Sequence, residues 1–172
     1  NCDLENILFH TDVSAKWITN RLEELGKEPN EILRHAFQVA TNIGILRRLN
    51  STEKWFLRFN INERQNDQDW LMPLIESNDI EKMIQIIVNN STQKINAKSI
   101  IKRFHRESSE LTSAGLSSVE LANGHDINRI LVILLELEHD RAAEFWVRDN
   151  LSIRDISDTQ IMQKIRDWEQ SN

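Results

Sequence analysis

Hydrophobic residues recur every three or four positions along most of the chain, which is the spacing of amphipathic helices. Residues 3–10 are expected to form a short first helix. The second helical segment includes Val13, Trp17 and Leu22, and Gly26 follows it at the position where helices commonly end. Pro29 suits the first turn of a third helix. We expect that third helix to end at Gly44. Its apolar face is formed by Leu33, Ala36, Phe37, Ala40 and Ile43.

The hydrophobic period changes after Gly44. Residues 45–49 are a short apolar run around two arginines, and residues 50–53 have the composition of a turn. Residues 54–59 then alternate basic with large apolar groups, with Lys54, Phe56 and Arg58 on one side and Trp55, Leu57 and Phe59 on the other, which is typical of a strand. The pattern therefore predicts a two-stranded hairpin over residues 45–59.

Residues 60–69 are polar and separate this first part from a second that is patterned as helices. The chain is thus expected to be mainly α, with one domain at 1–60, a linker at 61–68 and a helical bundle at 69–172. Residues 130–137 are apolar on nearly all sides, so we expect them at the centre of the bundle. Residues 108–118 are rich in serine and are expected to form a loop. The helices are expected near 69–77, 79–90, 96–110, 126–149 and 157–170.

Charge divides along the same boundary. The chain has 27 acidic and 21 basic side chains, for a net charge of −6. Residues 1–60 hold eight of each sign, so the whole excess of negative charge belongs to the bundle. The longest apolar run, Ile130 to Leu135, is too short to cross a membrane. With one cysteine and no leader-like segment at its start, the chain is expected to be intracellular, cytoplasmic or nuclear, and not to bind membranes.

The predicted order of three helices and a hairpin resembles the winged helix-turn-helix superfamily. The resemblance is carried by residues 32–49, read as the third helix and its glycine turn, and by residues 54–59, read as the wing. In DNA-binding members the third helix enters the major groove and the wing meets phosphates. In other members the same surface binds protein. The residues that the resemblance places on this surface are Arg34, His35, Gln38, Asn42, Arg47, Arg48, Lys54, Trp55 and Arg58.

A second group of cations lies on the helix expected near 96–110, where Phe104 is interleaved with them. It is the one net-positive element of the acidic half, and it can face either solvent or an acidic partner. Its members are Lys98, Lys102, Arg103 and Arg106.

Signals for catalysis are weak. The two His-Asp pairs, His125-Asp126 and His139-Asp140, resemble those of the HD phosphohydrolase family in residue type alone. The pairs are 14 residues apart on one expected helix, or about 21 Å, which is too far for a shared metal ion. The only cysteine, Cys2, lies in the terminal segment, and the four glycines form no phosphate loop. We expect no catalytic residues, no metal and no cofactor.

The sequence favours a non-enzymatic adaptor that acts through protein contacts, with a protein partner or a second copy of the chain, within an assembly that handles nucleic acid. The first alternative is a sequence-specific regulator that binds duplex DNA and has a helical dimerisation or sensing domain. A metal-dependent hydrolase is the second. No small-molecule ligand is indicated. A DNA-binding domain is usually basic as a unit, whereas residues 1–60 are neutral.

Overall fold

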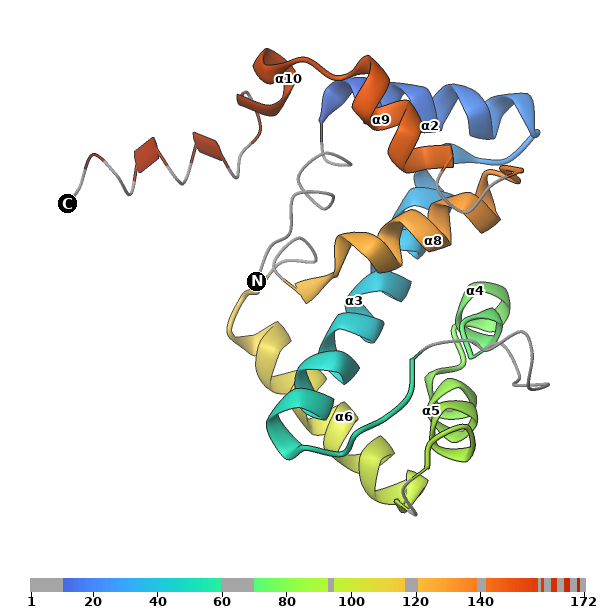
Figure 1. Cartoon of the computed structure of the whole chain (residues 1–172), viewed down its shortest axis with the longest axis vertical. Coiled ribbons are helices and arrows are strands. Elements are labelled where there is room, and N and C mark those ends of the chain that lie inside the picture. Colours follow the sequence, from blue (N-terminus) through green and yellow to red (C-terminus); the bar gives the residue numbers. More distant parts are fainter. Residues whose placement is uncertain are drawn as a thin grey trace.

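The computed structural model describes residues 11–59, 70–92, 95–116, 121–138, 142–157, 159, 162–163, 166–167 and 170. Helix α3 runs through the middle of the molecule and contacts α2, α4, α6 and α8, while α9 lies against α8 (Figure 1). The helices are α2 (Asp12–Glu24), α3 (Pro29–Glu53), α4 (Met72–Ser77), α5 (Ile80–Asn89), α6 (Ala97–Ser113), α8 (Gly124–Leu134), α9 (Ala142–Asn150) and α10 (Ile153–Ser157).

The prediction of a mainly α-helical chain is confirmed, but the predicted winged helix with a hairpin at residues 45–59 is wrong. The described residues contain no strand. Helix α3 continues through Gly44 and ends at Glu53. Ile43, Leu46 and Leu49 explain this result, because they lie three residues apart and all three are buried. A continuous helix places them in one row against the core, whereas a strand would separate them onto two faces.

Residues 54–59, expected to form the second strand, have no partner strand among the described residues, and Lys54 and Phe56 have left-handed backbones. Several backbone groups of the segment are bonded by side chains instead. The amide of Leu57 donates to Asn50 Oδ1 at 2.8 Å, and that of Arg58 donates to Ser91 Oγ at 2.9 Å. The Phe59 carbonyl accepts from Trp70 Nε1 at 2.8 Å. The alternating pattern therefore marks an irregular segment that is anchored to other elements, not a wing.

Helix α3 ends on a residue with a left-handed backbone, Lys54, at φ 54°. Glycine adopts this conformation without the cost that a Cβ atom brings. Replacing Lys54 by Gly should raise the free energy of unfolding by about 0.5 kcal/mol, after the larger entropy of the unfolded chain is allowed for. Thermal and urea denaturation measure the change. Ser51→Gly, inside the same helix, is the matched control and should lower stability by about 1 kcal/mol. Equal losses in both variants would contradict the assignment of this cap.

The single helix expected at 126–149 is wrong: it is divided into α8 and α9. Helix α8 ends with Glu136 at φ 52°, and the amide of Leu137 donates to the Val132 carbonyl at 3.0 Å. Lys27 Nζ donates to the Leu134 carbonyl at 2.8 Å and pairs with the Glu136 carboxylate, which lowers the pKa of that group. A cation at the carbonyl end of a helix stabilises it there. The end of α8 is thus fixed by a residue more than one hundred positions away.

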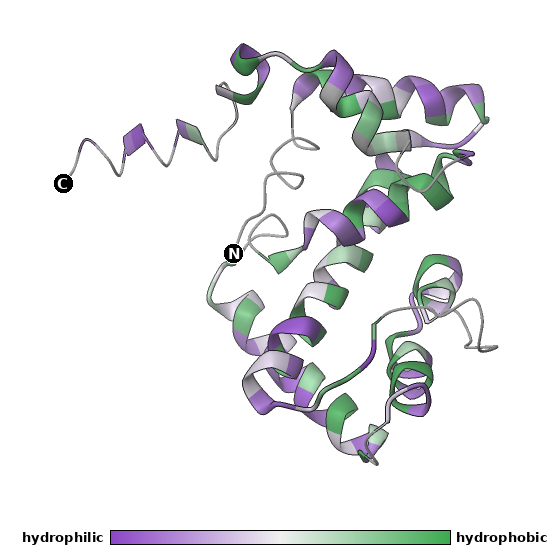
Figure 2. Ribbon diagram, in the orientation of Figure 1, coloured by the Kyte–Doolittle hydropathy of each residue, from purple (hydrophilic) through white to green (hydrophobic). Residues whose placement is uncertain are grey.

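The core is continuous across the helices. The central position predicted for residues 130–137 is confirmed in part: Ile130, Leu131 and Leu135 are fully buried, whereas Ile133 and Leu137 are half-buried at the edge of the core. Figure 2 shows that α5 and α8 are among the most hydrophobic ribbons, in keeping with their places against the rest of the core. Trp17 of α2 stacks on Trp146 of α9, with ring centroids 4.3 Å apart. The short helix expected at 3–10 and the linker expected at 61–68 both lie outside the described residues, so that helix and the division into domains stay predictions.

Candidate interaction groove along helix α3

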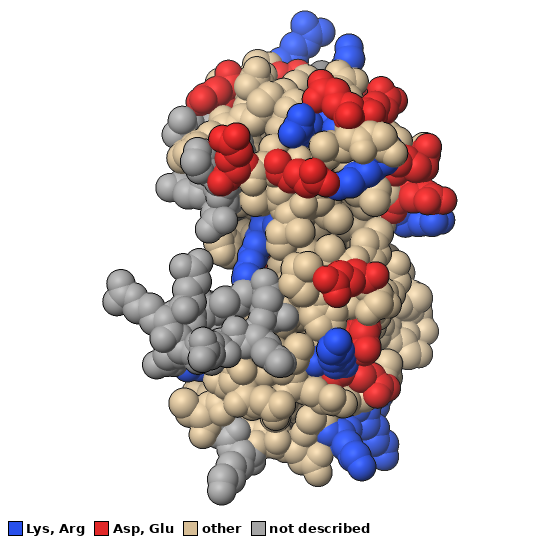
Figure 3. All heavy atoms as spheres, turned by 90° about the vertical axis from the view of Figure 1, so that its right-hand side faces the viewer, with Lys and Arg blue, Asp and Glu red and all other residues tan. Residues whose placement is uncertain are grey.

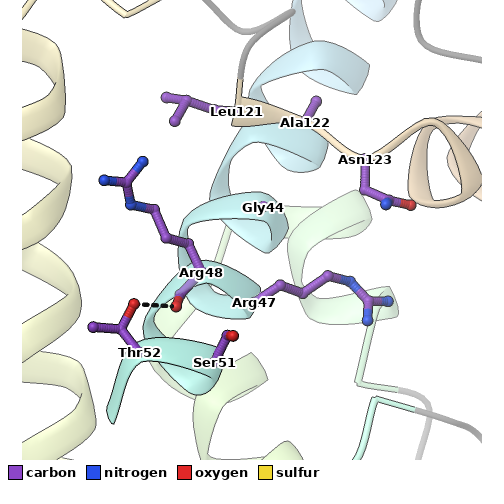
Figure 4. Close-up of a pocket in the computed structure, with 8 residues that line it drawn as sticks. All are labelled: Gly44, Arg47, Arg48, Ser51, Thr52, Leu121, Ala122 and Asn123. Carbon is purple, nitrogen blue, oxygen red and sulfur yellow. Dashed lines mark hydrogen bonds between the residues drawn. The ribbon is translucent and has the colours of Figure 1, made fainter. Parts of the chain in front are cut away.

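One side of α3 borders two hollows. The first, which we call the α3–α6 groove, has a volume of about 500 Å³. The second, which we call the arginine pocket, has a volume of about 400 Å³ and lies between α3 and the segment that leads into α8 (Figure 4). The groove is lined by Arg34, Phe37, Gln38, Thr41, Asn42, Ile45, Ser108, Leu111, Thr112, Leu116 and Leu121. The pocket is lined by Gly44, Arg47, Arg48, Ser51, Thr52, Leu121, Ala122 and Asn123.

A close backbone contact separates the two hollows. A Cβ atom placed on Gly44 would lie 1.8 Å from the carbonyl oxygen of Leu121 and 3.3 Å from the Cα of Ala122. Only a residue without a side chain allows the 121–122 backbone to approach α3 this closely. Gly44, which we expected to end a helix, is therefore a packing residue in the middle of one.

The α3–α6 groove combines an apolar floor with polar groups that are already oriented. Thr41 Oγ1 donates to the Phe37 carbonyl at 2.7 Å, and Thr112 Oγ1 donates to the Ser108 carbonyl at 2.8 Å. Each hydroxyl group thus donates its hydrogen bond to a carbonyl of its own helix, and its oxygen can still accept a hydrogen bond from a ligand. Arg34 is exposed and supplies donors at one end. Since both walls are helices, these groups are held in fixed positions.

The two arginine side chains of the arginine pocket do not point toward a common ligand position. Arg47 donates through Nε and Nη2 to the two carboxylate oxygens of Asp126, both at 2.7 Å, and its guanidinium lies 4.4 Å from the centroid of the Phe59 ring. Arg48 Nε lies 3.6 Å from Glu107 Oε1. Figure 4 shows the two arginine side chains pointing in opposite directions from α3. The Arg47 guanidinium is therefore engaged within the protein, whereas Arg48, whose side chain is 58% exposed, only lies near Glu107. The two groups are not presented together to an anion.

The structure divides the predicted surface of the third helix among several places. Arg34, Gln38 and Asn42 line the groove, although Asn42 is buried and its Nδ2 donates to Asn78 Oδ1 at 3.4 Å. His35 lies on another side of α3, where its Nε2 bonds to the Ile75 carbonyl at 2.8 Å. Because a carbonyl can only accept, this ring nitrogen carries the proton. The four residues therefore do not form one exposed reading face.

The residues expected on the wing lie after the end of α3. Lys54 is exposed, while Trp55 and Arg58 are half-buried. Phe56, between them, is 63% exposed and has a φ of 55°. An exposed aromatic residue in this backbone region is uncommon.

The basic stripe expected on α6 is divided in two. Arg103 bridges Glu53 and Glu107 at 3.1 and 2.8 Å, and these carboxylates raise its pKa. Arg106 pairs with Glu110 at 2.8 Å and lowers the pKa of that carboxyl. The remaining members, Lys98 and Lys102, are exposed and form no ion pair with a described residue. The stripe thus contributes two available cations instead of four.

The sequence analysis missed the α6 wall of the groove. Residues 108–118 were expected to be a loop, yet α6 extends to Ser113, and Ser108 and Thr112 face α3 from it. The signal was available, because Phe104, Glu107 and Leu111 continue the helical spacing of the buried face. Serine and threonine obscured it, since their hydroxyl groups favour turns unless they bond back to the helix, as those of Thr112 and Ser113 do here.

Carboxylate, histidine and cysteine side chains do not gather at either hollow. The described lining residues include no aspartate, glutamate, histidine or cysteine. Across the described part of the chain, no group of three or more such residues could hold a metal ion. His105 lies 3.7 Å from Glu81 on the surface, and Asp126 is bonded to Arg47. His139, Asp140 and Cys2 lie outside the described residues.

The sequence matches no family model, no curated protein and no solved structure. Among the described helices, none is both long enough and apolar enough to span a membrane. The groove is therefore the feature on which a function can be based.

Proposed function

We propose that this protein is a non-enzymatic interaction module that holds a segment of a protein partner in the α3–α6 groove. The observation that carries the proposal is the groove itself. It combines an apolar floor from Phe37, Ile45 and Leu111 with hydrogen-bonding groups on its walls. Grooves of this kind between rigid helices accept the apolar side of a peptide and orient it through a few polar contacts.

A photo-reactive amino acid at Gln38 tests the proposal. Gln38 is exposed and lines the groove, whereas Gln85 on α5 is exposed outside it. In extract of the source cells, the probe at Gln38 should give a discrete cross-linked product that excess unlabelled protein suppresses. The probe at Gln85 should not give that product. No product from Gln38, or the same product from both positions, would contradict the proposal.

Duplex DNA binding is the alternative that the sequence raised, and the geometry does not favour it. Two of the cations expected to hold phosphates, Arg47 and Arg48, face Asp126 and Glu107. A phosphate contact by Arg47 would have to displace the Asp126 carboxylate, and Glu107 offsets part of the charge of the exposed Arg48. The chain also carries a net charge of −6.

We expect no binding to a labelled duplex at low ionic strength, where attraction between protein and phosphate is strongest. Fluorescence anisotropy across a salt series measures it. Binding that weakens steeply as salt rises would instead support the DNA interpretation, because counterion release has that signature.

A further inference from the structure

Unpaired charges of opposite sign lie at opposite ends of the molecule. Near the turn from α2 to α3 and the end of α8, four glutamates form no ion pair with a described residue, and we call them the acidic end. Around the end of α3 and the start of α6, four cations are likewise without an ion pair to a described residue, and we call them the basic end. The acidic end comprises Glu23, Glu28, Glu31 and Glu138, and the basic end comprises Lys54, Arg58, Lys98 and Lys102.

Contacts between helices hold the parts of each end together. Lys27, beside Glu28, bonds to Leu134 and Glu136, which brings the end of α8 to the α2–α3 turn. At the other end Arg103 of α6 pairs with Glu53, the last residue of α3. Figure 3 shows Lys and Arg together at the lower end of one face, while the upper part of that face carries most of its Asp and Glu with some Lys and Arg among them.

The two ends cannot neutralise each other within one chain. Helix α3 holds them apart, since its 25 residues from Pro29 to Glu53 span about 36 Å. That distance is several times the screening length of about 8 Å at physiological ionic strength. Two copies of the chain can bring the ends together, because the acidic end of one then faces the basic end of the next.

An exposed aromatic residue strengthens the basic end as a contact surface. Phe56 is 63% exposed and lies between Lys54 and Arg58 in the chain. Its φ of 55° is a strained conformation for a residue with a side chain. Aromatic side chains surrounded by cations are common anchors at protein interfaces.

We propose that the basic end docks onto the acidic end of a second copy of this chain, in a head-to-tail arrangement. Such an interface uses two different surfaces and leaves one of each free, so association continues beyond a dimer unless the ring closes. The proposal uses neither hollow beside α3 and stands apart from the proposed groove function.

Sedimentation velocity on the full chain, over a range of concentration and salt, tests the proposal. The wild-type chain should associate reversibly, and salt should weaken the association. Two charge-reversed variants, Glu23→Lys/Glu138→Lys and Lys98→Glu/Lys102→Glu, should each lose it by more than about tenfold in the association constant, because each cancels the net charge of one end and places like charges opposite one another at the substituted positions. An equimolar mixture of the two should associate again, since each carries the surface that the other needs.

A second pair of variants tests Phe56 without changing charge. Phe56→Ser should weaken self-association, whereas Ile153→Ser, which removes a side chain 85% exposed on α10, should not. Helical circular dichroism should be the same in all variants. A wild-type chain that stays monomeric, a mixture that does not recover association, or equal effects of the two serine variants would overturn the proposal.

Discussion

Replacing Gly44 by alanine should destabilise the protein by about 3 kcal/mol or more. The new methyl group would lie 1.8 Å from the Leu121 carbonyl oxygen, and the nearest atoms are backbone, which cannot rotate aside. Either α3 or the 121–122 segment must move, and added volume in a closely packed site costs about 1–3 kcal/mol even where side chains can adjust. Thermal and urea denaturation measure the loss.

Whether Gly44→Ala lowers or raises stability distinguishes the close backbone contact from helix propensity. Helix propensity alone predicts the opposite result, because alanine is favoured over glycine in a helix interior by about 1 kcal/mol. Ser51→Ala, at an exposed position of the same helix, is the control and should change stability by less than about 0.5 kcal/mol. A Gly44→Ala protein that melts at a higher temperature than the wild type would show that the 121–122 backbone does not approach α3.

Breaking the pair between Arg47 and Asp126 should cost about 3 kcal/mol. The Asp126 carboxylate is 3% exposed and receives two bonds of 2.7 Å from one guanidinium. Arg47→Ala would leave that carboxylate buried without its cation, which is the costly way to remove a buried ion pair. We expect a loss at the low end of the usual range of about 3–5 kcal/mol, because the Arg47 side chain is 35% exposed and the pair is therefore partly in contact with water.

A double variant shows whether the loss comes from the unpaired carboxylate. Replacing both partners, Arg47→Met and Asp126→Leu, should recover most of the stability lost in Arg47→Ala, because no unpaired charge remains. Arg34→Ala, an exposed cation on the same helix, should change stability by less than about 0.5 kcal/mol. Equal losses for Arg47→Ala and Arg34→Ala would mean that Arg47 is free at the surface.

Much of the fold follows from local sequence. The left-handed Gly26, the start of α3 at Pro29 and the N-cap of α5 at Asp79 were all predictable, because each depends on a residue with a strong conformational preference. The two largest errors involve long-range contacts. A glycine often ends a helix, but α3 continues through Gly44, where the 121–122 backbone packs against the position that a Cβ atom would occupy. The end of α8 carries no glycine or proline and is capped by Lys27.

The candidate site was only partly predictable for the same reason. The exposed residues Arg34 and Gln38 were found from their spacing on one helix. The chemistry of Arg47 was not, because an arginine that pairs with Asp126, 79 positions away, looks in sequence like any other surface cation. The opposite wall of the groove depends on where α6 ends, and its serine and threonine residues resemble a loop until their bonds within the helix are known.

Two neighbouring substitutions on α6 test the groove most directly. Thr112 and Ser113 are both exposed and each bonds back to its own helix, at 2.8 and 2.9 Å, but only Thr112 lines the groove. The measurement is competition: unlabelled variants are added to wild-type protein that carries the photo-reactive group at Gln38. If the groove holds the partner, Ser113→Arg should suppress the cross-linked product as well as wild type does, and Thr112→Arg should fail to suppress it. Equal suppression by both variants would contradict the account.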